Sequence, residues 1–379
     1  MGQEKGKGTD MRILHTGDLH LDSPFSGLDI ASAERRRREM RDTFSRMMRY
    51  AREEALDMVI ISGDLFDSSF VTRETVSLLT KEFSALGCPV VITPGNHDPY
   101  TEDSVWSKTE FSKNVYIFKS PELERISFDL LSCDVYGYAF TSQYKRECAV
   151  SGAVQDGERI NILACHADTQ SPISSYAPLP LSCLREFSAD YAALGHIHTP
   201  DAANAAISGL GAYCGCPEGR DFGECGVKGA LVVSIEKGNT RIEEVRFCKR
   251  IYEEATVSVE GAADMSDICG AVDSFVTSSA YGEEHLLRIY LTGAVSPSLV
   301  INTRAAEENK RGLFLLSVVD ATSPTLNGEA LLSDPGIRGE LYRVLLPKLE
   351  SADPEKRREG ALALRYALAA LSGEDISDI

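Results

Sequence analysis

The sequence contains short blocks of aspartate, asparagine and histidine residues that could hold metal ions and move protons. Five of its seven histidines lie in these blocks. The blocks offer eight such side chains: Asp18, His20, Asp64, Asn96, His97, His166, His196 and His198. Oxygen and imidazole donors without thiolates suit manganese, iron or zinc in a hydrolytic site, and not a closed structural zinc site. The chemistry that these residues indicate is hydrolysis of a phosphate ester by two metal ions.

Most of these blocks follow short apolar segments that are typical of buried strands. The segments are 12–16 before Asp18, 58–62 before Asp64, 90–92 before Asn96, 160–164 before His166, and 191–194 before His196. Helices predicted over about 32–56 and 72–86 separate the first three, which indicates parallel strands with right-handed crossovers. Ligands gather beyond the carboxyl ends of such strands, so we expect five strand ends to converge on one site.

The remaining segments predict a second sheet and a separate C-terminal part. Alternating apolar residues over 115–140 and 228–247 indicate antiparallel strands of a second sheet packed on the first. Beyond about residue 253, strands over 256–259, 286–291 and 313–319 alternate with helices over 266–278 and 298–309. Two further helices, about 336–346 and 354–372, each carry a narrow apolar stripe. Such a stripe packs on the parent domain or lies against a partner.

The bulk properties exclude some classes of protein. A chain of 379 residues is long enough for two domains. The net charge of −18 argues against coating DNA through the overall field of the protein, but a metal pair would supply local positive charge. Arginines 35–38 lie on a predicted helix and are expected to pair with nearby carboxylates, with phosphate contact left open. No segment has the ~20 apolar residues of a membrane span, so we expect a cytoplasmic protein.

The blocks resemble the signature of the calcineurin-like metallophosphoesterase superfamily. That signature is Asp-x-His, Gly-Asp, Gly-Asn-His-Asp/Glu, a lone His and Gly-His-x-His, and all five parts occur here in order. Residues 14–20 are similar to the opening of the SbcD-like DNA repair exonucleases. Residues 21–25 and 213–222 look closer to their YhaO-like branch, which usually has proline and then serine or asparagine where Cys214 and Cys216 stand.

The resemblance implies an α/β fold, namely a two-sheet αββα metallophosphoesterase sandwich with a small C-terminal α/β capping domain and terminal helices. The expected organisation is a flexible leader over 1–11, a metallophosphoesterase domain over 12–252, a capping α/β domain over 253–325 and a helical partner-binding region over 326–379.

The resemblance also implies a role for each site residue. One metal would be held by Asp18, His20, Asp64 and His198, and the other by Asp64, Asn96, His166 and His196. The carboxylate of Asp64 would then bridge two divalent ions, for which manganese is expected and iron or zinc are alternatives. A hydroxide between the metals would attack phosphorus, His97 would act as general acid, and Asp98 would orient His97 through a hydrogen bond.

The function that follows from the resemblance is a two-metal-dependent DNA nuclease that acts in DNA repair with a coiled-coil ATPase of the SbcC-like type. DNA and that ATPase are the expected partners, while a homodimer is left open. One alternative is a phosphodiesterase or phosphatase acting on small nucleotides or phosphoproteins, since its metal motifs would be the same. A non-catalytic scaffold that docks an ATPase is the other, although the complete ligand set argues against it.

Overall fold

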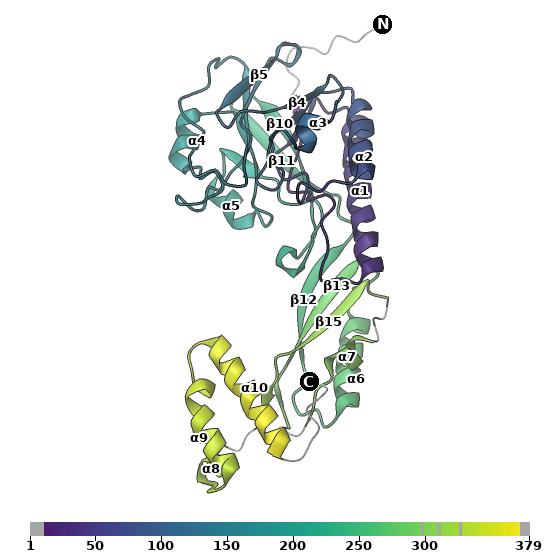
Figure 1. The fold of residues 1–379 in the computed structure, drawn as a ribbon, viewed down its shortest axis with the longest axis vertical. Helices are drawn as coiled ribbons and strands as arrows, with labels where there is room; N and C mark the ends of the chain where they lie inside the picture. The colour runs from purple at the N-terminus through teal and green to yellow at the C-terminus, as the bar shows by residue number, and fades with distance from the viewer. Residues whose placement is uncertain (1–10, 297–298, 309, 311, 326–327, 372–379) are drawn as a thin grey trace. The chain divides into compact units, whose positions relative to one another are not determined.

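The computed structural model describes residues 11–296, 299–308, 310, 312–325 and 328–371, so the expected leader lies outside the described residues apart from Met11 (Figure 1). The chain divides into two compact units. The first is formed by residues 1–220 and 227–249, and the second by 221–226 and 250–379. Among the described residues, no helix combines the length and apolar character needed to cross a bilayer.

The first unit contains two sheets whose strands run mainly parallel. The six-stranded sheet has the order β11-β10-β1-β2-β3-β4, and the five-stranded sheet has the order β5-β6-β7-β8-β9. The strands of the first are β1 Met11–Thr16, β2 Met58–Ile61, β3 Val90–Ile92, β4 Val115–Ile117, β10 Gly229–Glu236 and β11 Asn239–Arg246. Those of the second are β5 Glu124–Phe128, β6 Cys133–Gly137, β7 Ile160–His166, β8 Tyr191–Gly195 and β9 Gly211–Tyr213.

The expected distribution of strands between the sheets is wrong in three respects. Residues 115–117, expected in the second sheet, form β4, which pairs parallel with β3 in the first sheet. Segment 228–247 forms β10 and β11 in the first sheet, because β10 pairs antiparallel with the edge of β1, from Met11 opposite Ile235 to His15 opposite Leu231. Strands β7 and β8 belong to the second sheet, where they extend the parallel order that begins at β6. The periodicity of a strand shows which side chains are buried, but not which sheet edge the strand joins.

Helices cover both outer faces of the paired sheets, which gives four layers. Helices α1 Ile30–Glu53 and α2 Arg73–Ser84 pack on the first sheet, where Phe44 and Phe83 lie in one buried cluster with Val59. Ile60 of the first sheet and Ile162 of the second belong to the core between the sheets. The short helices α3 Val105–Lys108, α4 Leu181–Phe187 and α5 Asp201–Ala206 complete the unit. The expected αββα sandwich is confirmed.

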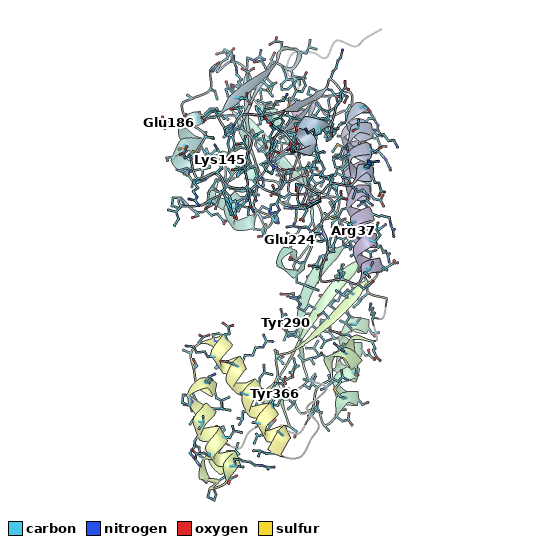
Figure 2. All side chains as sticks on the ribbon, viewed as in Figure 1. Arg37, Lys145, Glu186, Glu224, Tyr290 and Tyr366 are labelled. Atoms are coloured by element: carbon cyan, nitrogen blue, oxygen red, sulfur yellow. The ribbon has the colours of Figure 1, made fainter. Side chains whose placement is uncertain are left out.

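The second unit contains a small parallel sheet followed by helices. Strands β12 Ile251–Ser258, β13 His285–Thr292 and β15 Leu315–Asp320 form the sheet, with β14 Ala294–Val295 and β16 Ser323–Pro324 paired beside it. Helices α6 Met265–Ser278 and α7 Thr303–Glu307 belong to this part, and α8 Gly328–Ser333, α9 Ile337–Leu349 and α10 Pro354–Leu371 follow. Tyr290, which Figure 2 labels on β13, donates a 2.9 Å hydrogen bond to Glu254 of β12.

The terminal helices are anchored within their own unit. Leu364 and Leu368 of α10 form a buried cluster with Tyr342 of α9. Arg365 is also buried, and it donates hydrogen bonds to Thr322 Oγ1 at 3.0 Å and to the carbonyl of Leu299 at 2.7 Å. The apolar stripe of α10 therefore packs on its parent unit, whereas Ile337 and Val344 of α9 are 69% and 65% exposed.

Candidate metal centre

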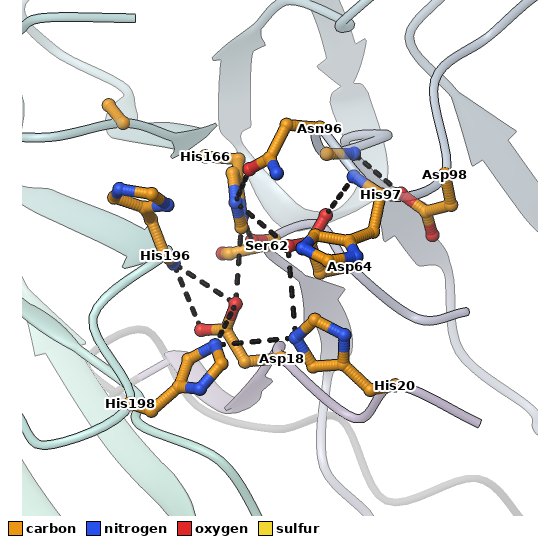
Figure 3. Close-up of polar contacts among 12 residues, drawn as sticks. Asp18, His20, Ser62, Asp64, Asn96, His97, Asp98, His166, His196 and His198 are labelled. Atoms are coloured by element: carbon orange, nitrogen blue, oxygen red, sulfur yellow. Dashed lines mark hydrogen bonds and ion pairs between the residues drawn. The ribbon is translucent and has the colours of Figure 1, made fainter. Parts of the chain in front are cut away.

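The site is formed where strand ends of the two sheets meet, as Figure 3 shows. Asp18, Asp64 and Asn96 follow β1, β2 and β3, while His166 ends β7 and His196 follows β8. Hydrogen bonds between main-chain groups hold the first two loops together. The Asp18 N–H donates to the Gly63 carbonyl and the His20 N–H donates to the Asp64 carbonyl, both at 3.0 Å.

Two buried carboxylates face several imidazole rings. Asp18 is 0% and Asp64 is 2% exposed. The Asp64 Oδ2 atom lies 3.2 Å from His166 Nε2 and 3.8 Å from His20 Nε2, and Asp18 Oδ1 lies 3.5 Å from His198 Nε2. Two carboxylates buried at this depth are costly unless positive charge compensates them.

The donor atoms fall into groups of the size that metal ions occupy. Within each group the ligand atoms lie within 4.8 Å of one another. One group is Asp18, His20 and His198, and another is Asp18, Asp64 and His166. The amide oxygen of Asn96 is 2.9 Å from His166 Nε2. His196 is not in these groups, but its ring centroid is 5.1 Å from that of His166 and its N–H donates to Asp18 Oδ2 at 2.9 Å.

The protonation chemistry of these residues fits a bound cation. The Nε2 atoms of His20 and His198 lie 3.3 Å apart, so two ring nitrogens converge on one point beside Asp18. His166 donates from Nδ1 to the Ser62 carbonyl at 3.0 Å, which directs its Nε2 toward Asp64. Burial opposes protonation of His166, but the Asp64 and Asp18 carboxylates outweigh it and raise its pKa to about 9. A cation would supply the positive charge that this proton otherwise provides.

The pKa values of the other ionisable residues expected as ligands are shifted in the directions that burial and neighbouring charge dictate. Burial, followed by the nearby charge of His166, lowers the pKa of His196 to about 4. Burial also lowers the pKa of His20. For Asp64, burial opposes ionisation, yet the His166 imidazolium outweighs it and the pKa is held below its ordinary value. Neutral imidazole and ionised carboxylate are the forms that bind metal ions.

The loops that carry the candidate ligands adopt unusual backbone conformations. Asp18, His20 and Asp64 have φ values of 49°, 47° and 48°, in the left-handed region that L residues other than glycine seldom occupy. Gly95 allows the third loop to approach closely, since a Cβ atom there would lie 2.2 Å from Asp64 Oδ1. Three of the candidate ligands therefore lie on left-handed backbone, and the third loop packs directly against Asp64.

His97 is exposed beside the candidate ligands and is held by a main-chain group. Its Nδ1 donates to the carbonyl of Asp67 at 2.9 Å, which leaves Nε2 to carry the exchangeable proton. The expected hydrogen bond from Asp98 to His97 is wrong. The Asp98 carboxylate instead accepts from the N–H groups of Gly95 at 2.7 Å and Leu65 at 2.8 Å. Burial, with the charge of Asp64 next, raises the pKa of Asp98 to about 8.

Two residues at the site have no role in the sequence-based prediction. Asp67 Oδ1 lies 3.4 Å from His20 Nδ1, a buried nitrogen for which the described residues provide no hydrogen bond of good geometry. Arg220 donates to the same Asp67 oxygen at 3.1 Å, and its other terminal nitrogen lies 3.1 Å from His198 Nδ1. The position of Asp67 three residues after Asp64 was a usable signal, because both lie on one loop. Arg220 comes from a distant segment, and only its similarity to the YhaO-like branch marked it.

His15 precedes the first block and is packed in the core. It is 0% exposed, with Nδ1 2.8 Å from Tyr191 Oη and Nε2 3.0 Å from Ser62 Oγ. Burial lowers its pKa from 6.5 to about 3, so His15 is neutral in the folded protein at neutral pH. The His15 ring contacts the hydroxyl of Ser62, and the Ser62 carbonyl in turn accepts a hydrogen bond from His166.

Arginines 35–38 are engaged in ion pairs. Arg36 is fully buried and lies 3.0 Å from both Glu39 and Glu218. Arg37 pairs with Glu34 at 2.8 Å on the surface. The expected pairing with carboxylates is therefore confirmed at these positions, and the burial of Arg36 excludes it from phosphate contact.

Comparison with known proteins finds a matching family model and several proteins of similar sequence. The family model for calcineurin-like phosphoesterases matches residues 11–200. An uncharacterized metallophosphoesterase, YhaO of Bacillus subtilis, is 28% identical over 75% of this chain and 72% of its own length. A subunit of the nuclease SbcCD from Staphylococcus epidermidis is 26% identical over 51% of this chain and 58% of its own. The DNA double-strand break repair protein Mre11 of Methanopyrus kandleri is 26% identical over 79% of this chain and 66% of its own length.

The family match spans half of the chain and includes every block that forms the site, with donor groups that suit metal binding. The chain therefore belongs to the calcineurin-like phosphoesterase family and is a metal-dependent hydrolase of phosphate esters.

Proposed function

We propose that this protein is a two-metal DNA nuclease that hydrolyses phosphodiester bonds in DNA repair. The observation that carries the proposal is the exposed His97 beside buried carboxylates and imidazoles, in a chain whose relatives include nuclease subunits. A phosphodiester reaching this centre would meet both a cationic site and a proton donor. Those are the two requirements for displacing an alkoxide from phosphorus.

The proposed ligands divide between two ions. Asp18, His20, Asp64 and His198 would hold one, and Asp64, Asn96, His166 and His196 the other, with manganese as the proposed metal. When bound, such a pair lowers the pKa of water and neutralises charge on the phosphate. The mixed oxygen and imidazole donors of the described groups fit manganese, iron or zinc.

The residues around the ions have separable tasks. His97 is proposed to donate a proton from Nε2 to the leaving oxygen, since its Nδ1 is already engaged with the Asp67 carbonyl. Asp98 fastens the loop that carries Leu65 to the loop that carries Gly95, and so sets the distance between Asp64 and His97 indirectly. The His97 N–H also donates to Asp64 Oδ1 at 2.9 Å, which ties the general acid to the bridging carboxylate.

The second unit is proposed to cap the substrate and to bind an ATPase partner. The apolar residues Ile337 and Val344 are spaced by seven positions on α9 and are mostly exposed. Such a stripe suits contact with another helix. Relatives include nuclease subunits of SbcCD, and the proposed partner of this chain is a coiled-coil ATPase of the SbcC-like type. A cytoplasmic location stays a prediction.

A single assay separates the nuclease from the alternative enzyme. The purified protein is incubated with Mn²⁺ and, in parallel, with single-stranded DNA, duplex DNA and a generic phosphodiester dye, with chelated protein as the control. Digestion of either DNA with Mn²⁺ but not with the chelated protein supports the proposal. Hydrolysis of the dye with neither DNA digested would instead support a phosphodiesterase or phosphatase for small nucleotides or phosphoproteins.

A further inference from the structure

We propose that Tyr144 and Tyr176 form a stacking platform for an unpaired nucleobase next to the metal centre, so that the preferred substrate is a single strand or a frayed end. This inference rests on the proposed nuclease function and specifies its substrate. It comes from the exposed aromatic surface beside the site, which the metal ligands and His97 do not use.

A series of ring contacts leads from the surface to the ligands. The ring centroid of Tyr144 lies 5.9 Å from that of Tyr176, with the planes at 37°. Tyr176 lies 5.3 Å from His196, with the planes at 39°, and His196 lies 5.1 Å from His166. A strand whose phosphate occupies the metal centre would therefore place a neighbouring base within reach of these rings.

The main chain that carries the two tyrosines is held in place before any substrate binds. Tyr144 and Tyr176 lie on separate loops that pair through an isolated bridge between Lys145 and Tyr176. The Lys145 N–H donates to the Ser175 carbonyl at 2.9 Å, and the Ala177 N–H donates to the Lys145 carbonyl at 2.6 Å. A main chain that is already ordered reduces the conformational entropy lost on binding, which favours affinity.

The exposure of Tyr144 separates a binding role from a packing role. Tyr176 is partly buried against His196, and core packing alone would explain it. Tyr144 is 51% exposed, so its ring is not needed to fill the core. The exposed Arg146 lies two residues further on, whereas the ammonium of Lys145, which Figure 2 labels, donates to the Pro121 carbonyl at 2.8 Å. An exposed aromatic ring close in sequence to an exposed arginine forms a surface suited to a flexible, negatively charged strand.

The geometry favours unpaired bases over duplex DNA. In a duplex the faces of each base are covered by its neighbours, whereas an unpaired base offers them to aromatic side chains. Stacking of this kind tolerates any sequence, because every base has an aromatic face. The platform is therefore expected to select strand ends and gaps without reading their sequence.

The test measures binding to the full-length protein in chelator, so that no strand is cut. Fluorescence anisotropy at low salt compares a twelve-residue oligothymidine with an abasic strand of the same length, for Tyr144→Ala, Tyr144→Phe and Leu130→Ala. Leu130 is fully exposed at the opposite end of β6 and serves as the control for loss of apolar surface. Tyr144→Ala is expected to weaken oligothymidine binding roughly 5- to 140-fold. Tyr144→Phe should stay within about twofold of the parent protein, because it keeps the ring.

The abasic strand decides between stacking and other causes. A loss confined to oligothymidine supports the platform, since the abasic strand has the same phosphates and no bases. Equal losses for both strands, or no loss for oligothymidine, would overturn it, as would a blunt duplex that binds more tightly than the single strand. Because binding is measured without turnover, a protein that shows this pattern but digests no DNA with Mn²⁺ would contradict the proposed nuclease and leave the platform supported.

Discussion

Replacing Asp67 tests whether this residue supports one of the two proposed metal ions. Asp67→Ala removes the carboxylate that lies 3.4 Å from His20 Nδ1 but leaves the main-chain carbonyl that accepts from His97. Groups that orient a metal-binding histidine typically contribute ~10- to 100-fold to affinity. The 3.4 Å separation is longer than an ordinary hydrogen bond of ~2.7–3.2 Å, so we expect about tenfold, or about 1.4 kcal/mol. The substitution also removes the ion pair between Asp67 and Arg220, which is partly exposed and should add less than ~1 kcal/mol to this loss.

Equilibrium dialysis of Mn²⁺ measures this effect without turnover. At limiting metal, Asp67→Ala should retain one ion near the affinity of the parent protein and bind the other about tenfold more weakly. Asp67→Asn keeps an acceptor oxygen and should show a smaller loss. Asp103→Ala is the control, because Asp103 is 95% exposed and pairs with Lys108 at the surface. Unchanged affinity, or equal weakening of both ions, would refute the idea that Asp67 acts through His20.

Four further outcomes are expected. His97→Ala should keep both metals by elemental analysis and lose ~10²–10⁴-fold in turnover, and loss of metal would make His97 a ligand. Glu218→Ala should destabilise the first unit by ~1–3 kcal/mol in calorimetry, because it removes one of the two carboxylates that pair with the buried Arg36 and leaves Glu39, and an unchanged free energy of unfolding would contradict that pairing. Burial lowers the pKa of His15 from 6.5 in the unfolded chain to about 3 in the folded protein, so the stability that neutral His15 contributes is complete above pH 6.5 and is lost as pH falls toward 3. His15→Asn does not titrate, so with chelator present it should flatten the dependence of the unfolding free energy on pH between 6.5 and 5 by up to ~1.4 kcal/mol per pH unit. An unchanged slope would contradict the assignment. A double substitution of Ile337 and Val344 by aspartate should abolish capture of an SbcC-like ATPase without lowering the melting temperature, whereas retained capture would exclude this stripe as the docking surface.

Substitution on α9 is a sharper test of docking than removal of the last helix. Truncation after Ser351 would expose the apolar face of Tyr342 that Leu364 and Leu368 cover. It would also remove Arg365, which is buried against Thr322. Loss of binding after truncation would therefore report unfolding as readily as loss of a docking surface.

Local patterns were sufficient to predict the strand–loop units that carry the candidate ligands. Asp18 and Asp64 come directly after short buried strands, and both loops point to the same edge because β1 and β2 are parallel. The four-layer arrangement followed from the same alternation of strands and helices together with the family resemblance. Each of these features depends on residues close together in the chain.

Features that depend on contacts between distant segments could not be predicted in this way. The partners Arg36 and Glu218 are separated by 182 residues, so no helical spacing reveals that this arginine is buried. The same holds for Arg220 beside His198, because the loop that carries Arg220 has no periodic structure. For His97, proximity in sequence was misleading. Its neighbour Asp98 points toward main-chain N–H groups, and the carbonyl that holds the ring comes from Asp67 on another loop.

The left-handed backbone at Asp18, His20 and Asp64 has a consequence for protein engineering. Each such residue costs on the order of 1–3 kcal/mol and persists only because the surrounding structure enforces it. Copying the side chains alone onto the strand ends of another scaffold would let these loops relax to ordinary conformations and turn the carboxylates away. A functional graft would have to include the hydrogen bonds between neighbouring loops, such as that from the Asp18 N–H to the Gly63 carbonyl. The smallest transferable unit of this centre is thus a set of interlocked loops, and not a list of ligands.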